Sequence, residues 1–255
     1  MKNIELSPKN FIATPDALKN KIILVTGAGD GIGRVAALTF ARHGATVLLL
    51  GKTESKLNAV YDEIDAAHFP QAALLPFDLN ITDQEQYKTI ARVIDENFGR
   101  LDGLLHNASI LGDRSSIESY KPQRWMETMQ VNLNGPFMLT QALLPLLKKS
   151  DHASIAFTSS GVGRKGRAYW GAYGVSKFAT EGLMETLADE LANISHVRVN
   201  CINPGATRTR MRAQAYPAEN PEVLKTPEAI MPVYLYLMSN DSIAVTGKSF
   251  DAQPA

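Results

Sequence analysis

The sequence predicts an α/β fold built on a doubly wound parallel sheet, and two patterns support that prediction. Short apolar runs alternate along the chain with longer amphipathic segments, which is typical of strands followed by helices. The runs are rich in Val, Ile and Leu and lack alternation of apolar with polar residues, so we expect strands buried on both faces. The chain has 255 residues, of which 45% are hydrophobic, enough for one large domain with a sizeable core.

The predicted elements follow one another in regular order. The apolar runs, interpreted as strands, cover residues 21–27, 45–51, 72–78, 101–108, 153–160 and 197–205, and a last strand is expected near 248–250. The amphipathic segments, interpreted as helices, cover residues 32–43, 54–67, 83–98, 123–148, 172–194 and 227–238. Repeated strand–helix–strand units imply right-handed crossovers and an arrangement of the Rossmann type.

The chain is interpreted as a single domain over residues 21–255, preceded by an N-terminal extension over residues 1–20. No linker, repeat or low-complexity tract interrupts it. The least regular stretch is residues 208–226, between a strand and a helix, on the side where ligands bind in such sheets. A mobile substrate lid and an ordinary surface loop are both open interpretations of this stretch.

Composition excludes several functional classes. Basic and acidic residues balance at 26 each, so no nucleic acid or membrane partner is expected. One cysteine, Cys201, cannot form a disulfide within the chain, which fits a reducing compartment. The N-terminus lacks a signal-peptide pattern and no apolar run is long enough to span a bilayer, so a cytoplasmic location is expected. The five histidines are scattered without metal-ligand spacing, so we expect no metal.

A glycine-rich turn, TGAGDGIG at residues 26–33, joins the first strand to the first helix. Glycine allows a sharp turn and close approach of a ligand, because it tolerates positive φ and has no Cβ. The helix then points free N–H groups and the positive end of its dipole at the turn, so a pyrophosphate is the expected occupant. The residues assigned to this cradle are Gly27, Asp30, Gly31, Ile32 and Gly33.

The end of the second strand bears on which dinucleotide is bound. An acidic residue there would hold a ribose 2′-hydroxyl, but Gly51 and Lys52 occupy the positions, and Lys52 is suited to pair with a 2′-phosphate. This favours NADP(H) over NAD(H). Asp30 argues the other way, because a cation inside the turn would suit a phosphate better. A solvated Lys52 with no such role is the alternative.

Tyr173 is the one tyrosine of the sequence with a lysine four residues later, Lys177. On a helix these two side chains share a face, about 5–6 Å apart. Free tyrosine has a pKa of about 10, and a nearby ammonium group would lower it toward the range useful for proton transfer. The alternative is a packed tyrosine beside a solvated lysine.

The motifs in their order along the chain resemble the short-chain dehydrogenase/reductase family, from about residue 21 to the end. T-G-x-x-x-G-I-G is similar to that family's cofactor turn, and HNAS at 106–109 is similar to its N-N-A-G, with His106 and Ser109 as departures. The resemblance implies further cofactor contacts from Asp78, Leu79, Asn107, Ala108, Pro204, Gly205, Thr207 and Thr209, and from Tyr173 and Lys177.

The same resemblance implies a catalytic set of Ser160, Tyr173, Lys177 and Asn132. Ser160 lies thirteen residues before Tyr173, the family's spacing for the serine that binds the substrate oxygen, with Ser159 as the rival one residue away. Asn132, in MQVNLNGPF, is the implied proton-relay residue that locally disturbs a helix, and Asn134 is its rival.

The resemblance implies an NADP(H)-dependent enzyme that reduces a carbonyl group or oxidises an alcohol on a small molecule. A non-catalytic dinucleotide sensor on the same fold is the alternative function, and it would bind the cofactor without turnover. Dehydration or epimerisation on the same fold is a further alternative. Family members usually form dimers or tetramers through their long helices, so a homodimer or homotetramer is implied.

Overall fold

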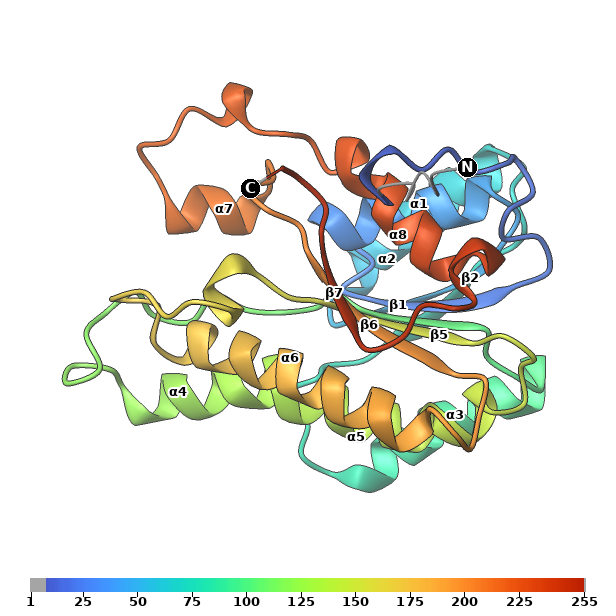
Figure 1. Ribbon diagram of the computed structural model, residues 1–255, viewed down its shortest axis with the longest axis horizontal. Coiled ribbons are helices and arrows are strands. Elements are labelled where there is room, and N and C mark those ends of the chain that lie inside the picture. The colour runs from blue at the N-terminus through green and yellow to red at the C-terminus, as the bar shows by residue number, and fades with distance from the viewer. Residues whose placement is uncertain (1–7, 255) are drawn as a thin grey trace, which may run out of the picture.

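A fully parallel sheet forms the middle layer of the protein, and its strands follow the predicted order along the chain (Figure 1). The computed structural model describes residues 8–254. The strands of the described part are β1 (Ile22–Thr26), β2 (Thr46–Gly51), β3 (Ala73–Pro76), β4 (Gly103–His106), β5 (Ser154–Thr158), β6 (Arg198–Asn203) and β7 (Lys248–Asp251). Their spatial order is β3-β2-β1-β4-β5-β6-β7, so the chain winds outward from β1 in one direction and from β4 in the other. This is the predicted doubly wound sheet.

Helices cover both faces of the sheet (Figure 1). The helices are α1 (Gly31–Arg42), α2 (Glu54–Ala66), α3 (Gln84–Phe98), α4 (Pro122–Met129), α5 (Gly135–Leu147), α6 (Gly171–Leu191), α7 (Arg210–Ala215) and α8 (Met231–Met238). Helices α1, α2 and α8 pack on one face, and α3, α5 and α6 pack on the other. Short 3₁₀ turns, including Pro8–Asn10 and Gly161–Gly163, complete the connections.

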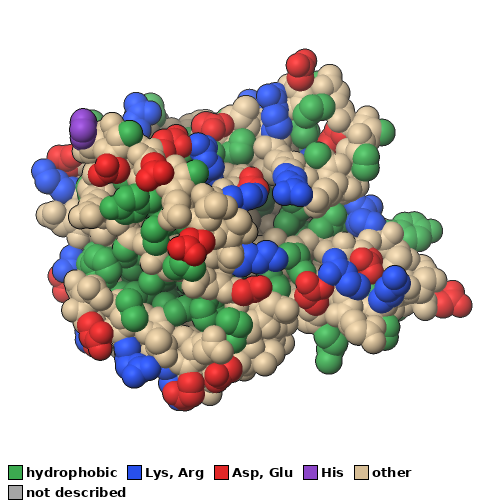
Figure 2. Space-filling model, turned by 180° about the vertical axis from the view of Figure 1, so that it is seen from behind, with side chains coloured by type: hydrophobic (Ala, Val, Ile, Leu, Met, Phe, Trp, Pro, Cys, Tyr) green, Lys and Arg blue, Asp and Glu red, His purple; other side chains and the backbone are tan. Residues whose placement is uncertain are grey.

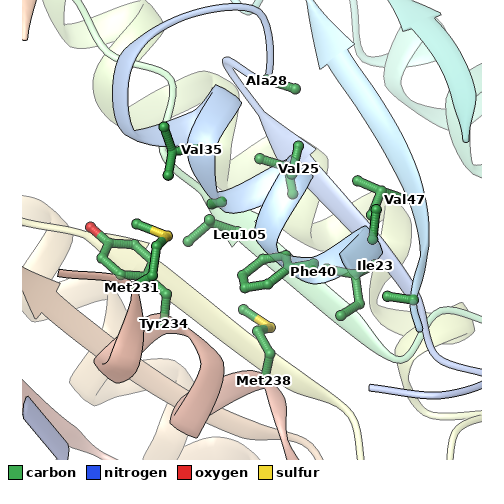
Figure 3. Close-up of a cluster of buried hydrophobic side chains, with 14 of the residues drawn as sticks. Ile23, Val25, Ala28, Val35, Phe40, Val47, Leu105, Met231, Tyr234 and Met238 are labelled. Carbon is green, nitrogen blue, oxygen red and sulfur yellow. The ribbon is translucent and has the colours of Figure 1, made fainter. Parts of the chain in front are cut away.

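Two apolar cores, one on each face, hold these layers together. Successive residues of β1 point to opposite faces of the sheet. Ile23 and Val25 therefore join the core under α1 and α8, where they pack near Phe40 and Met238 (Figure 3). Leu24 joins the other core. All five residues of β1 are buried, which is why its sequence shows no polar alternation.

The helix predicted over residues 123–148 is interrupted. It divides into α4 and α5, with a π-helical turn at Gln130–Asn134 between them. The side chain of Asn132 in this turn bonds both backbone groups of Ile110, on the neighbouring loop. A π turn of this kind is common at functional sites and leaves the apolar pattern of the flanking helices intact.

The segment before the sheet packs on α8. Leu18 is fully buried, and the Phe11 ring lies 5.4 Å from the Tyr236 ring in an edge-to-face arrangement. Within the N-terminal extension assigned to residues 1–20, the described part thus belongs to the core of the domain. Residues 1–7 and 255 lie outside the described residues.

Candidate active site

A cavity of about 910 Å³ opens at the carboxyl ends of the strands, where ligands bind in doubly wound sheets. Figure 2 shows the molecule hollowed beneath the lobe that carries α7. The cavity is continuous from the glycine-rich turn to Tyr173. Every predicted site residue lines it apart from Gly33 and Asn132, which lie behind its surface.

The glycine-rich turn requires glycine at three positions. Gly27 and Gly31 have φ of +67° and +52°, a region that other residues rarely adopt. A Cβ on Gly33 would lie 2.3 Å from the carbonyl oxygen of Gly27 and 2.5 Å from Nδ2 of Asn107. The turn is therefore packed against the loop after β4, and its backbone is left open toward the cavity.

The hydroxyl group of Thr26 joins the turn to that neighbouring loop. Its Oγ1 accepts hydrogen bonds from the backbone N–H groups of Asn107 at 2.9 Å and Ala108 at 3.0 Å, and donates to the carbonyl of Leu105 at 3.3 Å. Asn107 also receives a long hydrogen bond of 3.4 Å from the Thr158 hydroxyl. The predicted residues Asn107 and Ala108 are thus held at the cavity wall by a threonine that the sequence analysis did not single out.

Asp30, the residue that argued against NADP(H), is paired with a lysine. Its carboxylate binds Nζ of Lys56, and this bond is the main reason why the pKa of Asp30 lies below its usual value. Gly29 accommodates the pairing, because a Cβ there would lie 2.8 Å from Cβ of Lys56. Lys52 is exposed at the end of β2 and lines the same cavity. The charge of Asp30 is therefore paired with a lysine of α2.

The remaining predicted cofactor residues lie on two loops. Asp78, after β3, accepts a hydrogen bond from the N–H of Asn80 at 2.9 Å, and its buried neighbour is Leu79. After β6, Thr207 is buried and donates to the carbonyl of Pro204 at 3.0 Å. Two further predicted residues follow the same strand: Gly205 has φ of +70°, and the Thr209 hydroxyl caps α7 by accepting from the N–H of Arg212.

The phenol of Tyr173 lies at the cavity wall, near the start of α6. Burial raises its pKa to about 12, and a hydrogen bond with the Ser160 side chain acts in the opposite direction. Among the side chains of the chain itself, it is Ser160 and not Lys177 that lowers this pKa. Ser160 follows β5 and also caps the 3₁₀ turn that begins at Gly161. The rival Ser159 is buried, and its hydroxyl has no protein partner among the described residues.

Lys177 lies below Tyr173 on the same face of α6, as the spacing predicts. Its Nζ lies 5.6 Å from the centre of the Tyr173 ring and donates to the carbonyl of Thr158 at 2.7 Å. Burial lowers the pKa of Lys177 to about 8, against smaller opposing effects of Cys201 and Glu181. The lysine is therefore close to its titration point near neutral pH, which suits a group that exchanges protons.

Burial of Lys177 has a predicted effect on stability. Between about pH 8 and 10.5, the unfolded chain carries a proton on this lysine that the folded protein lacks. The lysine thus destabilises the folded state below pH 8, and this effect fades as the pH rises to 10.5. We expect Lys177→Met to raise the free energy of unfolding at pH 7 by about 1–3 kcal/mol. Loss of the hydrogen bond between Lys177 and the Thr158 carbonyl offsets part of this increase.

Urea unfolding of both proteins at pH 7 and pH 10 measures this effect. The difference in free energy of unfolding between Lys177→Met and the wild-type protein should be smaller at pH 10 than at pH 7. Because all other titrating groups are the same in both proteins, their contributions cancel in this difference. A gain of equal size at both pH values would contradict a lowered lysine pKa.

Asn132 holds the loop after β4 in place. Its Oδ1 accepts from the N–H of Ile110 at 2.8 Å, and its Nδ2 donates to the Ile110 carbonyl at 3.0 Å and to the Ser176 hydroxyl at 3.1 Å. Its side chain thereby joins α6 to the cavity loop. The side chain of Asn134, the rival residue, is exposed and bonds that of Gln130; a proton-relay role for Asn132 stays a prediction.

A family comparison agrees with this geometry. The family model described as "short chain dehydrogenase" matches residues 21–220. The chain belongs to the short-chain dehydrogenase family. Its seven-stranded parallel sheet, described over residues 8–254, is the fold expected of a short-chain dehydrogenase.

Individual relatives of this short-chain dehydrogenase are similar along almost their whole length. The chain is 57% identical over 239 residues to "Uncharacterized oxidoreductase YciK" of Escherichia coli K12, covering 94% of each protein. It is similar to a short chain dehydrogenase from Shigella flexneri 2a strain 301 complexed with NADP, with 56% identity, a TM-score of 0.90, and coverage of 94% of this chain and 100% of that one. A short chain dehydrogenase from E. coli CFT073 complexed with NADPH is 57% identical, again with a TM-score of 0.90 and coverage of 94% and 100%.

Some residues that shape the site of this short-chain dehydrogenase had no signal in the sequence. Gln253, near the C-terminus, donates to the carbonyls of Pro204 and Ala206 and to the Thr207 hydroxyl, and so supports the loop after β6. Its partners lie more than 40 residues away along the chain. By contrast, a role for Thr26 at the site could have been predicted, because this residue immediately precedes Gly27 of the glycine-rich turn.

The residues of the cavity fit a dinucleotide. The turn is bare of side chains where Gly27, Gly31 and Gly33 stand, and the free N–H groups of the first turn of α1 lie behind it. Among residues 8–254, no group of three or more His, Cys, Asp or Glu side chains is placed to hold a metal ion. In the same range, no helix has the length and apolar character needed to cross a bilayer.

Proposed function

We propose that the protein is an NADP(H)-dependent oxidoreductase that interconverts a carbonyl group and an alcohol on a small molecule. The observation that supports this most directly is the placement of Tyr173 and Ser160 together in the cavity that begins at the glycine-rich turn. A nicotinamide cofactor bound there would supply or accept the hydride. The NADP and NADPH complexes of the relatives from Shigella and E. coli support the choice of cofactor.

The residues of the chain have separate roles in this proposal. The Ser160 hydroxyl donates a hydrogen bond to the substrate oxygen and orients it toward Tyr173. Tyr173 gives its phenolic proton to that oxygen during reduction and takes it back during oxidation. Lys177 is proposed to bind the nicotinamide ribose, and its bond to the Thr158 carbonyl keeps its Nζ 5.6 Å from the centre of the Tyr173 ring. Asn132 holds α6 and the adjoining loop at a constant separation.

The test of this function is NADPH oxidation in the presence of a panel of aldehydes and ketones. We expect saturable, carbonyl-dependent loss of NADPH absorbance. The alternative, a dinucleotide sensor, predicts NADPH binding with no turnover for any member of the panel. The intact set of Ser160, Tyr173 and Lys177 favours the enzyme, because a sensor has no use for a buried, proton-exchanging phenol.

Lys52 is proposed to bind the 2′-phosphate. We expect Lys52→Met to weaken NADPH binding by about tenfold, the usual value of one charged hydrogen bond to a phosphate, and to leave NADH binding unchanged. Nicotinamide fluorescence titration measures both affinities. Lys148→Met is a matched control, because Lys148 is exposed at the opposite end of the sheet, beyond α5. Equal losses for NADPH and NADH would show that Lys52 does not bind the 2′-phosphate.

The protein is further proposed to form a homodimer or homotetramer through α5 and α6. Phe137 on α5 and Val175 and Phe178 on α6 leave more than 40% of their surface exposed, which is costly in a monomer. Sedimentation analysis would show the oligomeric state. We also propose a cytoplasmic location, consistent with the single, buried thiol of Cys201.

A further inference from the structure

The start of α7 lies against the glycine-rich turn. A Cβ on Gly31 would lie 3.6 Å from Cγ2 of Thr209, the residue that caps α7. The 208–226 segment therefore approaches the turn at this point, although the two are far apart in the sequence. Arg210, the first residue of α7, follows directly after this contact and lines the cavity.

The positive charge of Arg210 acts on the turn. Lys56 lowers the pKa of Asp30 most, and the charge of Arg210 adds a smaller effect in the same direction. The Arg210 side chain is exposed and has no hydrogen bond or ion pair with any residue in the described range 8–254. Its guanidinium is therefore free to bind a ligand and close enough to the turn to attract an anion there.

Most other basic side chains of the cavity already have partners within the protein. Three of them pair with carboxylates: Lys56 with Asp30, Arg124 with Asp113 and Glu127, and Arg212 with Glu219. Two others donate to backbone carbonyls: Lys177 to that of Thr158, and Arg114 to those of Tyr169 and Ala215. Arg114 has no carboxylate partner, but it is also stacked on the Trp170 ring, 4.1 Å from its centre. The remaining cations are Lys52, proposed above to bind the 2′-phosphate, and Arg210.

The glycine-rich turn has a use for such a cation. The diphosphate of a dinucleotide is expected at the N-terminus of α1, where free N–H groups offer hydrogen bonds. The charges of Asp30 and Lys56 cancel at this place, because the two side chains are paired. A guanidinium group is well suited to a phosphate, since its planar set of donors matches the phosphate oxygens. Arg210 is placed to supply it.

We propose that Arg210 binds the diphosphate of the dinucleotide and thereby joins α7 to the glycine-rich turn across the bound cofactor. This inference rests on the proposed NADP(H)-dependent function and adds a binding residue to it. Arg210 acts on a group that NADPH and NADH share, whereas Lys52 acts on the 2′-phosphate that NADPH alone carries. Replacement of the two residues therefore has different expected effects on the two cofactors.

Arg210→Met tests the proposal in nicotinamide fluorescence titrations with NADPH and NADH. We expect both affinities to fall by about five- to tenfold, and by the same factor. Loss of affinity for NADPH alone would assign Arg210 to the 2′-phosphate and overturn the proposal, and so would unchanged affinity for both cofactors. Arg42→Met is the matched control, because Arg42 is exposed in the last turn of α1 and does not line the cavity. An equal loss in this control would show a general charge effect and contradict the proposal.

The double variant Lys52→Met/Arg210→Met shows whether the two cations bind different phosphates. If they do, the factors by which the single variants lower NADPH affinity multiply in the double variant, because separate contacts contribute independently. A double variant that binds NADPH as well as the weaker single variant would place both cations on one phosphate and overturn the proposal.

Two measurements separate ligand binding by Arg210 from a structural role in α7. Arg210→Lys keeps the charge and should recover part of the affinity lost in Arg210→Met. The loss in Arg210→Met should also shrink as KCl is raised from about 50 to about 500 mM, because salt screens the charge pair of the wild-type protein. Equal affinities of the Lys and Met variants, or a loss that is independent of salt, would overturn the proposal.

The wild-type titration separates failure of this inference from failure of the proposed function. Wild-type protein that binds neither NADPH nor NADH would remove both. Normal binding by the wild-type protein together with unchanged affinities in Arg210→Met would remove only the role of Arg210.

Discussion

Replacement of Tyr173 by phenylalanine is expected to lower the rate of carbonyl reduction by about 10²–10⁴-fold. The ring keeps its place between Lys177 and Trp170, but the group that transfers the proton is lost, and general acid catalysis contributes on the order of 10²–10⁴. NADPH affinity should change by less than a factor of about three, because the substitution removes only the hydroxyl group and leaves the ring in place between Lys177 and Trp170. Steady-state kinetics and fluorescence titration give the two values.

Tyr169→Phe is the control for this experiment. Tyr169 lies four residues earlier and is 60% exposed, so its hydroxyl is not expected to take part. Turnover near the wild-type value in Tyr173→Phe would remove Tyr173 from the proposed mechanism. An equal loss in both variants would point to a general effect of the helix start.

Replacement of Gly33 by alanine is expected to abolish measurable NADPH binding. The new Cβ would lie 2.3 Å from the Gly27 carbonyl oxygen and 2.8 Å from its carbon, both backbone atoms that cannot move without opening the turn. It would also displace the Asn107 amide, 2.5 Å away. The turn, α1 and the loop after β4 would therefore separate, with a loss of stability of about 1–3 kcal/mol typical of overpacking.

Gly166→Ala controls for the substitution itself, since nothing lies within 4 Å of a Cβ at that position. Thermal unfolding distinguishes loss of binding from loss of folding. If the Gly33→Ala variant remains folded and binds NADPH with wild-type affinity, the turn can accommodate a Cβ at this position and the prediction is wrong.

The central strands could be predicted from the sequence because burial on both faces selects apolar residues at most positions. Val25 and Leu24 belong to different cores, yet both are apolar, and this continuity is a stronger signal than periodicity. The family resemblance implied that Asn132 disturbs the helix, but the pattern of residues 123–148 did not show the break between α4 and α5, because Asn132 takes its partners from Ile110 and Ser176, which are distant in the chain.

In the candidate site, too, some features could be predicted from the sequence and others could not. The proximity of Tyr173 and Lys177 could be predicted because both lie on one helix, where spacing in the sequence determines distance. The pairing of Asp30 with Lys56 could not be predicted from the sequence, since it depends on how closely α2 approaches the turn at Gly29. The ion pair between Arg212 and Glu219 was not predicted either, since it depends on how the 208–226 segment folds back on itself.

The π-helical turn at Gln130–Asn134 sets the rotational phase between α4 and α5. A π turn takes in one residue more than an α turn, so α5 is rotated by roughly 100° from the position that an unbroken helix would give it. That rotation lets α5 bury Leu139, Leu143 and Leu147 against the sheet while α4 packs on α6. Deleting a single residue here would leave one of the two helices with its apolar face turned toward water.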